Sequence, residues 1–137
     1  NVKELGWNYY MNEFSAAIGL MQLKKLDALN HVRRNIAKFY DKEIDIEYKI
    51  PFDKRCSYHL YWIRVKNRNK FRKELNNNGI ETGTHYKPIH KMAFYKRTNK
   101  ILNTEKAGKE IVTIPIHPNL TQSQIDYIVK IINKFSS

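Results

Sequence analysis

The strongest constraint on the fold is a wide apolar stripe in residues 12–29. Apolar side chains recur there at helical spacing, at Phe14, Ala16, Ala17, Ile18, Leu20, Met21, Leu23 and Leu26. A stripe of this width is broader than one packing partner can cover. The sequence therefore predicts a long helix that contacts more than one neighbour and that exposes apolar surface when a neighbour is missing.

A second helical stretch follows directly, and its apolar face is narrower. That face comprises Val32, Ile36, Phe39 and Tyr40, while Arg33, Arg34 and Lys38 face water. The one plausible seam in the chain lies between the two stretches, near Asn30 and His31. We therefore expect two parts: residues 1–30, an N-terminal turn with a long helix, and residues 31–137, a small domain.

Three later segments have the composition of β-strands. "YHLYWIRV" (58–65) is dense in aromatic and β-branched residues, and "IETGTHY" (80–86) is a second strand or extended segment. "IVTIPIHP" (111–118) is a third, confined to a sheet edge or a strand end because Pro115 and Pro118 cannot donate to a ladder.

Short helices separate these segments. One covers residues 68–78 and stops at Gly79, and another covers residues 105–110, where Asn103 or Thr104 could cap it. A third follows Thr121, whose spacing to Gln124 is that of a capping box. We predict an α+β fold, with about three mainly antiparallel strands covered on one face by helices.

Composition excludes several classes of function. The chain has 137 residues and a single cysteine, Cys56, which argues against an internal disulfide and a structural zinc site. It contains no apolar run long enough to cross a membrane. It begins without Met or a basic apolar leader, and we expect a cytoplasmic protein. The net charge of +12 allows nucleic-acid binding, but the lysines are dispersed and no nucleic-acid motif accompanies them.

Familiar catalytic motifs are missing too. The sequence has no G-x-S-x-G, H-E-x-x-H, Walker A or G-x-G-x-x-G pattern. Cys56 and His59 are three residues apart but lack further close metal ligands. His85, His90 and His117 lie in loops or at strand ends beside prolines, where binding residues occur, although each is also compatible with a structural role.

Four ordered blocks of sequence resemble one enzyme family. They are "GWNYYMNEFSAAIGLMQLKKLD", "SYHLYWIRV", "NNGIETGTHYKPIHKMAFYK" and "NTEKAGKEIVTIPIHPNLTQSQIDYIVKII". Together they resemble the C-terminal third of the DegT/DnrJ/EryC1/StrS aminotransferases, from residue 6 to about residue 133. The resemblance implies the small C-terminal domain of a fold-type-I transferase that uses pyridoxal 5′-phosphate (PLP), preceded by a long helix at the interface of a homodimer.

The resemblance assigns a role to Asn8. In the family, the matching asparagine hydrogen-bonds the PLP phosphate in the neighbouring subunit's active site, and the helix after it lies at the dimer interface, where Ala16, Ala17 and Gly19 would allow close packing. An amide N–H suits this role because it can orient a phosphate oxygen. The alternative is that Asn8 only caps the helix. Two residues later, relatives usually carry arginine, whereas this chain has Tyr10, so a different substrate contact is implied there.

The resemblance also marks substrate-side residues. His85 and Tyr86 match a His-aromatic pair near the substrate entrance, and His90 and His117 match recurring positions that fix a loop or contact a ligand. The lysine that attaches PLP and the residues that hold the pyridine ring belong to the large domain and have no match in this chain, which should therefore be inactive alone.

The intact enzyme implied by the resemblance moves an amino group from a donor such as glutamate to a keto group of a nucleotide-linked sugar, in polysaccharide or amino-sugar biosynthesis. Two alternatives stay open. One is a non-catalytic binding or regulatory module with the same small domain, and the other is a basic nucleic-acid-binding domain.

Overall fold

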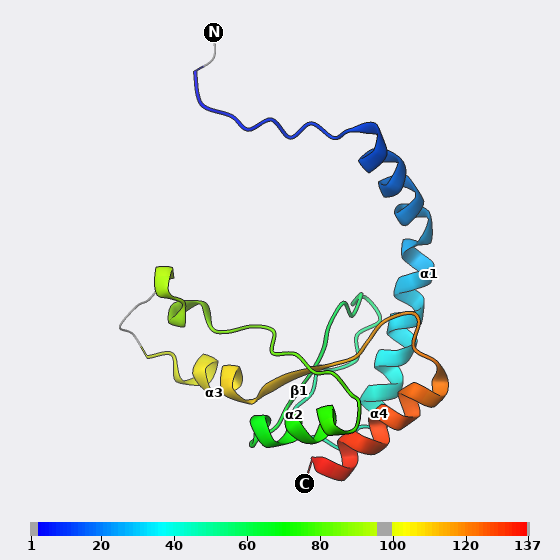
Figure 1. Ribbon diagram of the computed structural model, residues 1–137, viewed down its shortest axis with the longest axis vertical. Helices are drawn as coiled ribbons and strands as arrows, with labels where there is room; N and C mark the ends of the chain where they lie inside the picture. Colours follow the sequence, from blue (N-terminus) through cyan, green and yellow to red (C-terminus); the bar gives the residue numbers. More distant parts are fainter. Residues whose placement is uncertain (1–2, 96–99, 137) are drawn as a thin grey trace.

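The computed structural model describes residues 3–95 and 100–136 (Figure 1). An extended arm, residues 3–12, leads into a long helix whose second half joins a body formed by the rest of the chain. The elements are α1 (Glu13–Glu43), β1 (Tyr61–Arg64), α2 (Arg68–Asn77), the 3-10 turns η1 (Ile89–Lys91) and η2 (Ala93–Tyr95), α3 (Leu102–Glu110), β2 (Ile111–Ile114) and α4 (Gln122–Phe135). Helices around a small antiparallel sheet confirm the predicted α+β class.

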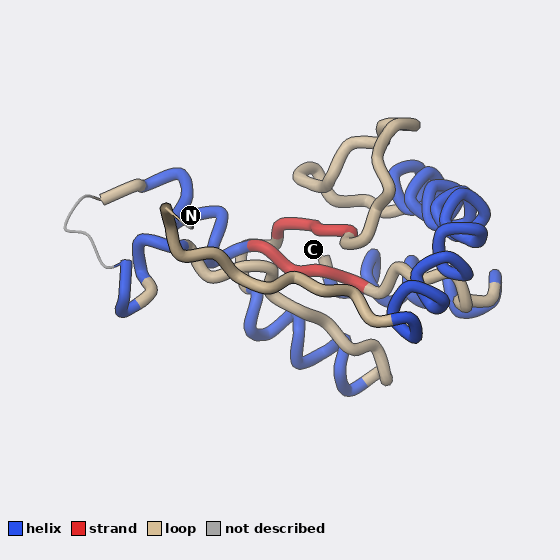
Figure 2. The backbone as a smooth tube through the Cα atoms, turned by 90° about the horizontal axis from the view of Figure 1, so that it is seen from above, coloured by secondary structure: helices blue, strands red, loops and turns tan. Residues whose placement is uncertain are grey.

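The sheet has two strands among the described residues. β1 and β2 pair antiparallel, with Tyr61 opposite Ile114 and Arg64 opposite Ile111, and they lie side by side in the middle of the body (Figure 2). The predicted second segment, 80–86, is extended, but among the described residues it joins β2 only through a bridge between Gly83 and Thr113. The antiparallel register would next set Glu81 opposite Pro115, which has no N–H, so the pairing ends there.

The core lies between the sheet, the second half of α1, α2 and α4. Tyr40 of α1 is fully buried, its hydroxyl donates to the Pro115 carbonyl at 2.9 Å, and its ring meets the Tyr61 ring edge-on at 5.2 Å. α4 adds a continuous apolar face, and the predicted Thr121–Gln124 capping box starts this helix. These contacts link the two ends of the sequence and fix the sheet against α1.

Two sequence-based boundaries were wrong. The two helical stretches at the N-terminal end are one helix, because α1 runs without a break through Asn30 and His31, neither of which is a helix breaker. α3 begins at Leu102 after Ile101, with no side-chain cap, whereas Asn103 or Thr104 was expected to cap it. Secondary structure therefore does not break at residue 30, where we expected the two parts of the chain to meet. Side chains of α1 are almost all exposed before Leu29, and most are partly or fully buried from Leu29 onward.

Candidate functional site

His85 lies beside β2 and contacts two other predicted or polar residues, Thr113 and Tyr86. It follows the single Gly83–Thr113 bridge, its peptide bond to Tyr86 is cis, and its ring Nδ1 lies 2.7 Å from the Thr113 Oγ1. Thr113 is buried in β2, while Tyr86 is 69% exposed and packs edge-on against the His85 ring at 4.9 Å. In the predicted His-aromatic pair, the imidazole is therefore hydrogen-bonded to Thr113, and the aromatic ring of Tyr86 is open to solvent.

The His85 ring lies against Gly83. A Cβ on Gly83 would come within 2.5 Å of His85 Cε1 and 2.7 Å of Thr113 Oγ1, closer than atoms can approach. Only glycine leaves this space, so Gly83 allows the imidazole to turn back onto Thr113.

A cavity of about 930 Å³ opens beside this edge. Its wall combines apolar side chains, such as Ile80 and Ile128, with polar groups that include His59, His85, His117, Gln124 and Tyr127. We expected His117 either to contact a ligand or to fix a loop. Its side chain is exposed and lines this cavity. The cavity thus gathers His85 with residues from the β2–α4 connection and from α4, which sequence spacing could not place together.

His90 occupies a different environment. It is buried in η1, and its Nε2 lies 3.4 Å from Glu105 Oε1, which is long for a hydrogen bond. The neighbouring Lys91 pairs with Glu105, and this hydrogen bond holds the pKa of the Glu105 carboxyl below its usual value. Gly108 packs against Pro88 as well. These contacts attach the segment after Tyr86 to α3, which favours the structural role for His90.

The arm carries the other two predicted residues. The Oδ1 atom of Asn8 accepts a hydrogen bond from the Tyr10 backbone N–H at 3.0 Å, whereas Asn12 caps α1 by accepting from the Ser15 N–H. The capping alternative for Asn8 is therefore wrong. Tyr10 is 79% exposed, and no hydrogen bond or ion pair joins residues 3–11 to the rest of the described chain. The arm and the segment 80–86 lie apart in this one chain (Figure 1), and among the described residues no hydrogen bond joins Asn8 or Tyr10 to His85 or Tyr86.

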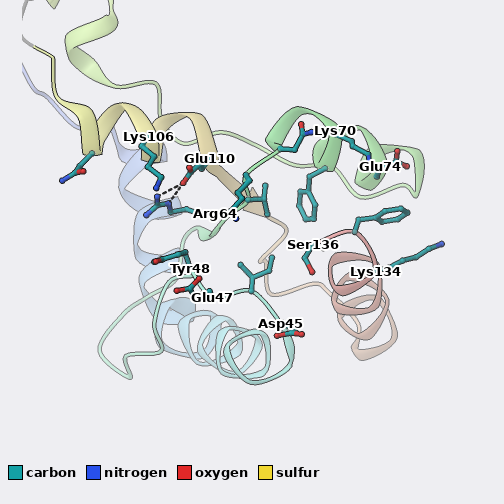
Figure 3. A pocket seen from close by; sticks show the side chains of 17 residues that line it. Asp45, Glu47, Tyr48, Arg64, Lys70, Glu74, Lys106, Glu110, Lys134 and Ser136 are labelled. Atoms are coloured by element: carbon teal, nitrogen blue, oxygen red, sulfur yellow. Dashed lines mark hydrogen bonds and ion pairs between the residues drawn. The ribbon is translucent and has the colours of Figure 1, made fainter.

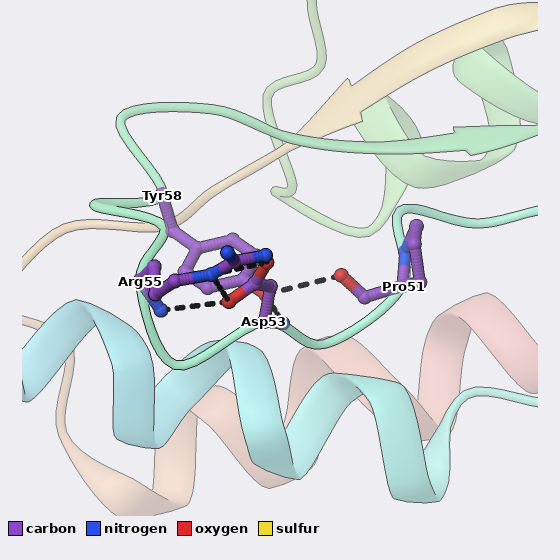
Figure 4. A network of polar contacts seen from close by, with 4 residues as sticks. All are labelled: Pro51, Asp53, Arg55 and Tyr58. Atoms are coloured by element: carbon purple, nitrogen blue, oxygen red, sulfur yellow. Dashed lines mark hydrogen bonds and ion pairs between the residues drawn. The ribbon is translucent and has the colours of Figure 1, made fainter.

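The loop that carries Cys56 and His59 is held in place by contacts within the loop itself. Buried Tyr58 accepts from the Asp53 N–H and donates to the Pro51 carbonyl, and Arg55 pairs with Asp53, lowering the pKa of that carboxyl to about 2 (Figure 4). No group of three His, Cys, Asp or Glu residues in 3–95 and 100–136 could hold a metal ion.

A second cavity of about 930 Å³ opens where β1 ends, at Arg64 and Val65 (Figure 3). Its main feature is a half-buried ion pair, Arg64 with Glu110 at 2.6 Å, and the Arg64 guanidinium also lies over the Tyr48 ring. The remaining wall mixes acidic and basic side chains, among them Asp45, Glu47, Lys70 and Lys134. The wall therefore carries charges of both signs and presents no surface of one sign.

Residues 1–133 match the sequence model of one family. The chain belongs to the DegT/DnrJ/EryC1/StrS aminotransferase family. Its fold agrees, because the chain superposes on Helicobacter pylori PseC, an aminotransferase involved in the biosynthesis of pseudoaminic acid, with a TM-score of 0.86 at 30% identity. The chain is also 34% identical to the UDP-4-amino-4,6-dideoxy-N-acetyl-beta-L-altrosamine transaminase of Campylobacter jejuni over 91% of its own length.

These family members are much longer than this chain. It covers 37% of the Campylobacter protein and 40% of the PseC chain. A third relative, described as the sugar aminotransferase Spr1654 of Streptococcus pneumoniae in its PLP form, superposes with a TM-score of 0.81 at 28% identity, over 92% of this chain and 36% of that one. Sugar aminotransferases among the relatives favour neither a nucleic-acid-binding domain nor a separate regulatory module.

Sequence reasoning missed two partners of the site residues. Thr113 is the one polar residue inside the apolar run "IVTI", and a polar residue flanked by strand-forming ones is a signal for a specific contact. Glu105, the partner of Lys91 and His90, carried no comparable signal.

Among the described residues, no helix is long and apolar enough to cross a membrane.

Proposed function

We propose that this chain is the C-terminal portion of a PLP-dependent aminotransferase, which moves an amino group from a donor such as glutamate to a keto group of a nucleotide-linked sugar. The observation that carries the proposal is the family match over residues 1–133, together with relatives named as sugar aminotransferases of which the chain covers less than half. A cytoplasmic homodimer acting in polysaccharide or amino-sugar biosynthesis is part of the same proposal.

The arm suits the phosphate of PLP. Because the Asn8 Oδ1 accepts from the Tyr10 N–H, the amide is oriented and its Nδ2–H groups are left as donors. A phosphate oxygen is a good acceptor for them, and the exposed arm can reach beyond its own body. PLP, when bound, supplies the electron sink for amino transfer. In this proposal Asn8 holds the phosphate in the neighbouring subunit, and residues 1–30 form the interface part of the chain.

The substrate side is assigned to three residues. His85 and Tyr86 stand at the sheet edge beside the cavity, with one ring held and the other exposed. Tyr10, which stands where relatives usually carry arginine, offers a hydroxyl and a ring in place of a cation. We assign all three to contacts with the sugar nucleotide, with Tyr10 favouring a neutral group where an arginine would favour an anion.

The lysine that attaches PLP lies outside this chain in this proposal, so residues 1–137 alone should not transaminate. Purified chain is mixed with PLP and glutamate, dialysed, and examined by visible absorbance and by assay of amino transfer. A stable cofactor band together with turnover would contradict the assignment.

The decisive experiment uses Asn8 in the intact enzyme. Asn8→Ala removes one hydrogen bond to a charged group, worth roughly 1.5–3 kcal/mol. PLP affinity should then fall about ten- to a hundredfold, since about 1.4 kcal/mol is a factor of ten. The matched control is Asn12→Ala, which removes the α1 cap and should leave PLP affinity unchanged.

A heterodimer separates action in the other subunit from action within the same chain. One subunit lacks the cofactor-attaching lysine, so a single productive site remains. Asn8→Ala on the lysine-free subunit should weaken PLP binding at that site, and the same change on the lysine-bearing subunit should not. The reverse pattern would place Asn8 at its own subunit's cofactor, and a non-catalytic module would bind no PLP in either arrangement.

A further inference from the structure

We propose that Thr113 is a positioning residue for His85: its hydroxyl donates to Nδ1 and thereby fixes the imidazole as the tautomer that carries its proton on Nε2. His85 then presents an N–H donor to an oxygen of the substrate. The proposal rests on the proposed function for the meaning of that contact, but its geometry is contained in this chain.

The Thr113 hydroxyl has one partner among the described residues. The backbone N–H and carbonyl of Thr113 are both used by Gly83, at 2.9 and 3.0 Å. Its side chain is buried, and its Oγ1 meets the His85 Nδ1 at 2.7 Å. A buried hydroxyl proton needs an acceptor, because leaving it unpaired costs desolvation free energy without a compensating bond.

This requirement selects the tautomer. If Nδ1 carried the proton, it would donate to Oγ1, and the Thr113 proton would have no acceptor among the described residues. If Nδ1 is bare, the Thr113 O–H donates to it and both groups are satisfied. The neutral ring then carries its proton on Nε2, which makes no hydrogen bond to any described residue.

Gly83 also restricts the position of the ring. Because a Cβ there would collide with His85 Cε1 and with Thr113 Oγ1, the imidazole lies directly on the glycine backbone. Thr113 and Gly83 also pair through both backbone hydrogen bonds, so the support is attached to β2. The ring orientation is therefore fixed by a strand residue and by the space that a glycine leaves.

A chemical class of ligand follows from this orientation. A neutral imidazole with its proton on Nε2 donates there and cannot accept a proton at that atom. The group it contacts is therefore an acceptor oxygen, which a sugar hydroxyl, a keto oxygen or a phosphate supplies. In this arrangement His85 orients the sugar nucleotide, and it is not a proton-accepting base through Nε2.

Nitrogen NMR of the ring tests the proposal on the chain of residues 1–137. ¹⁵N-labelled protein is measured at about pH 8.5, above the ordinary histidine range near 6.5, and the His85 signals are assigned by their loss in His85→Gln. We expect a protonated Nε2 and a bare Nδ1 whose resonance is shifted by an accepted hydrogen bond. Thr113→Val should move the Nδ1 resonance to that of a bare nitrogen without a donor, and Thr113→Ser, which keeps the hydroxyl, should restore the shift.

A proton on Nδ1 in the unsubstituted chain would overturn the proposal, and so would an Nδ1 resonance that Thr113→Val leaves unchanged. If the valine variant does not fold, the unsubstituted chain still decides: the Thr113 hydroxyl proton should exchange slowly with water and correlate with His85 Nδ1, and fast exchange would contradict the contact. No readout uses PLP or turnover, so a failure here is distinct from a failure of the proposed aminotransferase function.

Discussion

The two halves of α1 share one helix and one kind of apolar pattern, yet they have opposite surroundings. No side chain in residues 13–28 is buried, and Phe14 and Ile18 are 84% and 63% exposed. The second half lies against the body of the chain (Figure 1), and Ile36, Ala37 and Tyr40 are buried there. The pattern therefore tells where a helix needs a partner, and the chain supplies that partner for the second half alone.

The exposed half is best explained by a missing partner. Exposed apolar surface of this extent on a folded protein marks an interaction surface. The family membership and the short coverage of relatives support our proposal that the large domain and a second subunit cover it.

The largest contrast is expected from one substitution made in each half. Ile36→Ala removes a side chain that is 4% exposed and leaves a cavity, which should cost about 2–5 kcal/mol of the free energy of unfolding. Ile18→Ala, its matched control in the same helix, should change stability by less than about 0.5 kcal/mol. Chemical denaturation measures both, and equal losses would mean that the two halves share one core.

Alkaline pH should weaken the covered half. Burial raises the pKa of the Tyr40 and Tyr61 hydroxyls above that of a free tyrosine. A raised pKa means that the folded state holds the proton more tightly, so this stability is complete below about pH 10 and is lost as pH rises further. Denaturation midpoints followed from about pH 8 to 11 should fall, less steeply in Tyr40→Phe, and an equal slope in both proteins would refute the assignment.

The hydroxyl of Tyr40 also makes its own contribution. Tyr40→Phe removes its hydrogen bond to the Pro115 carbonyl, which should cost about 1 kcal/mol. Tyr9→Phe, in the exposed arm, is the control and should leave the free energy of unfolding unchanged. An unaltered midpoint in Tyr40→Phe would show that water replaces the lost donor.

The smallest effect is local to the start of α1. Asn12→Ala removes the cap on the Ser15 N–H, worth about 1 kcal/mol to the first helical turns. Because no side chain in these turns is buried, hydrogen exchange should quicken in residues 13–20 without a change in the global midpoint. Asn8→Ala should leave exchange in α1 as it is. Faster exchange in that variant would restore a capping role for Asn8.

Local signals in the sequence predicted much of the fold. The Thr121–Gln124 capping box, the stop at Gly79 and the dense apolar face of α4 are each contained within a few residues, and all three are present. The α+β class and the positions of the first and last strand segments followed from periodicity and strand-forming residues, whereas the pairing of these two segments with each other was not predicted.

Features that depend on distant residues could not be predicted. The second segment, 80–86, does not extend its ladder with β2 because Glu81 would next face Pro115, which lies more than 30 residues later in the sequence. The contact of His85 with Thr113 spans 28 residues, and the Glu105 contacts depend on where η1 packs on α3. Asn30 and His31 suggested a seam, but neither residue stops a helix when the following turn is held in a core.

Hydrogen exchange along α1, combined with sedimentation of the same sample, tests the central claim most directly. For the dilute chain we predict fast-exchanging amides in residues 14–26, slow-exchanging amides in residues 36–43 and a sedimentation coefficient that rises with protein concentration. A monomer at every concentration with slow exchange along the whole of α1 would contradict the claim that the first half of this helix requires a partner outside the chain.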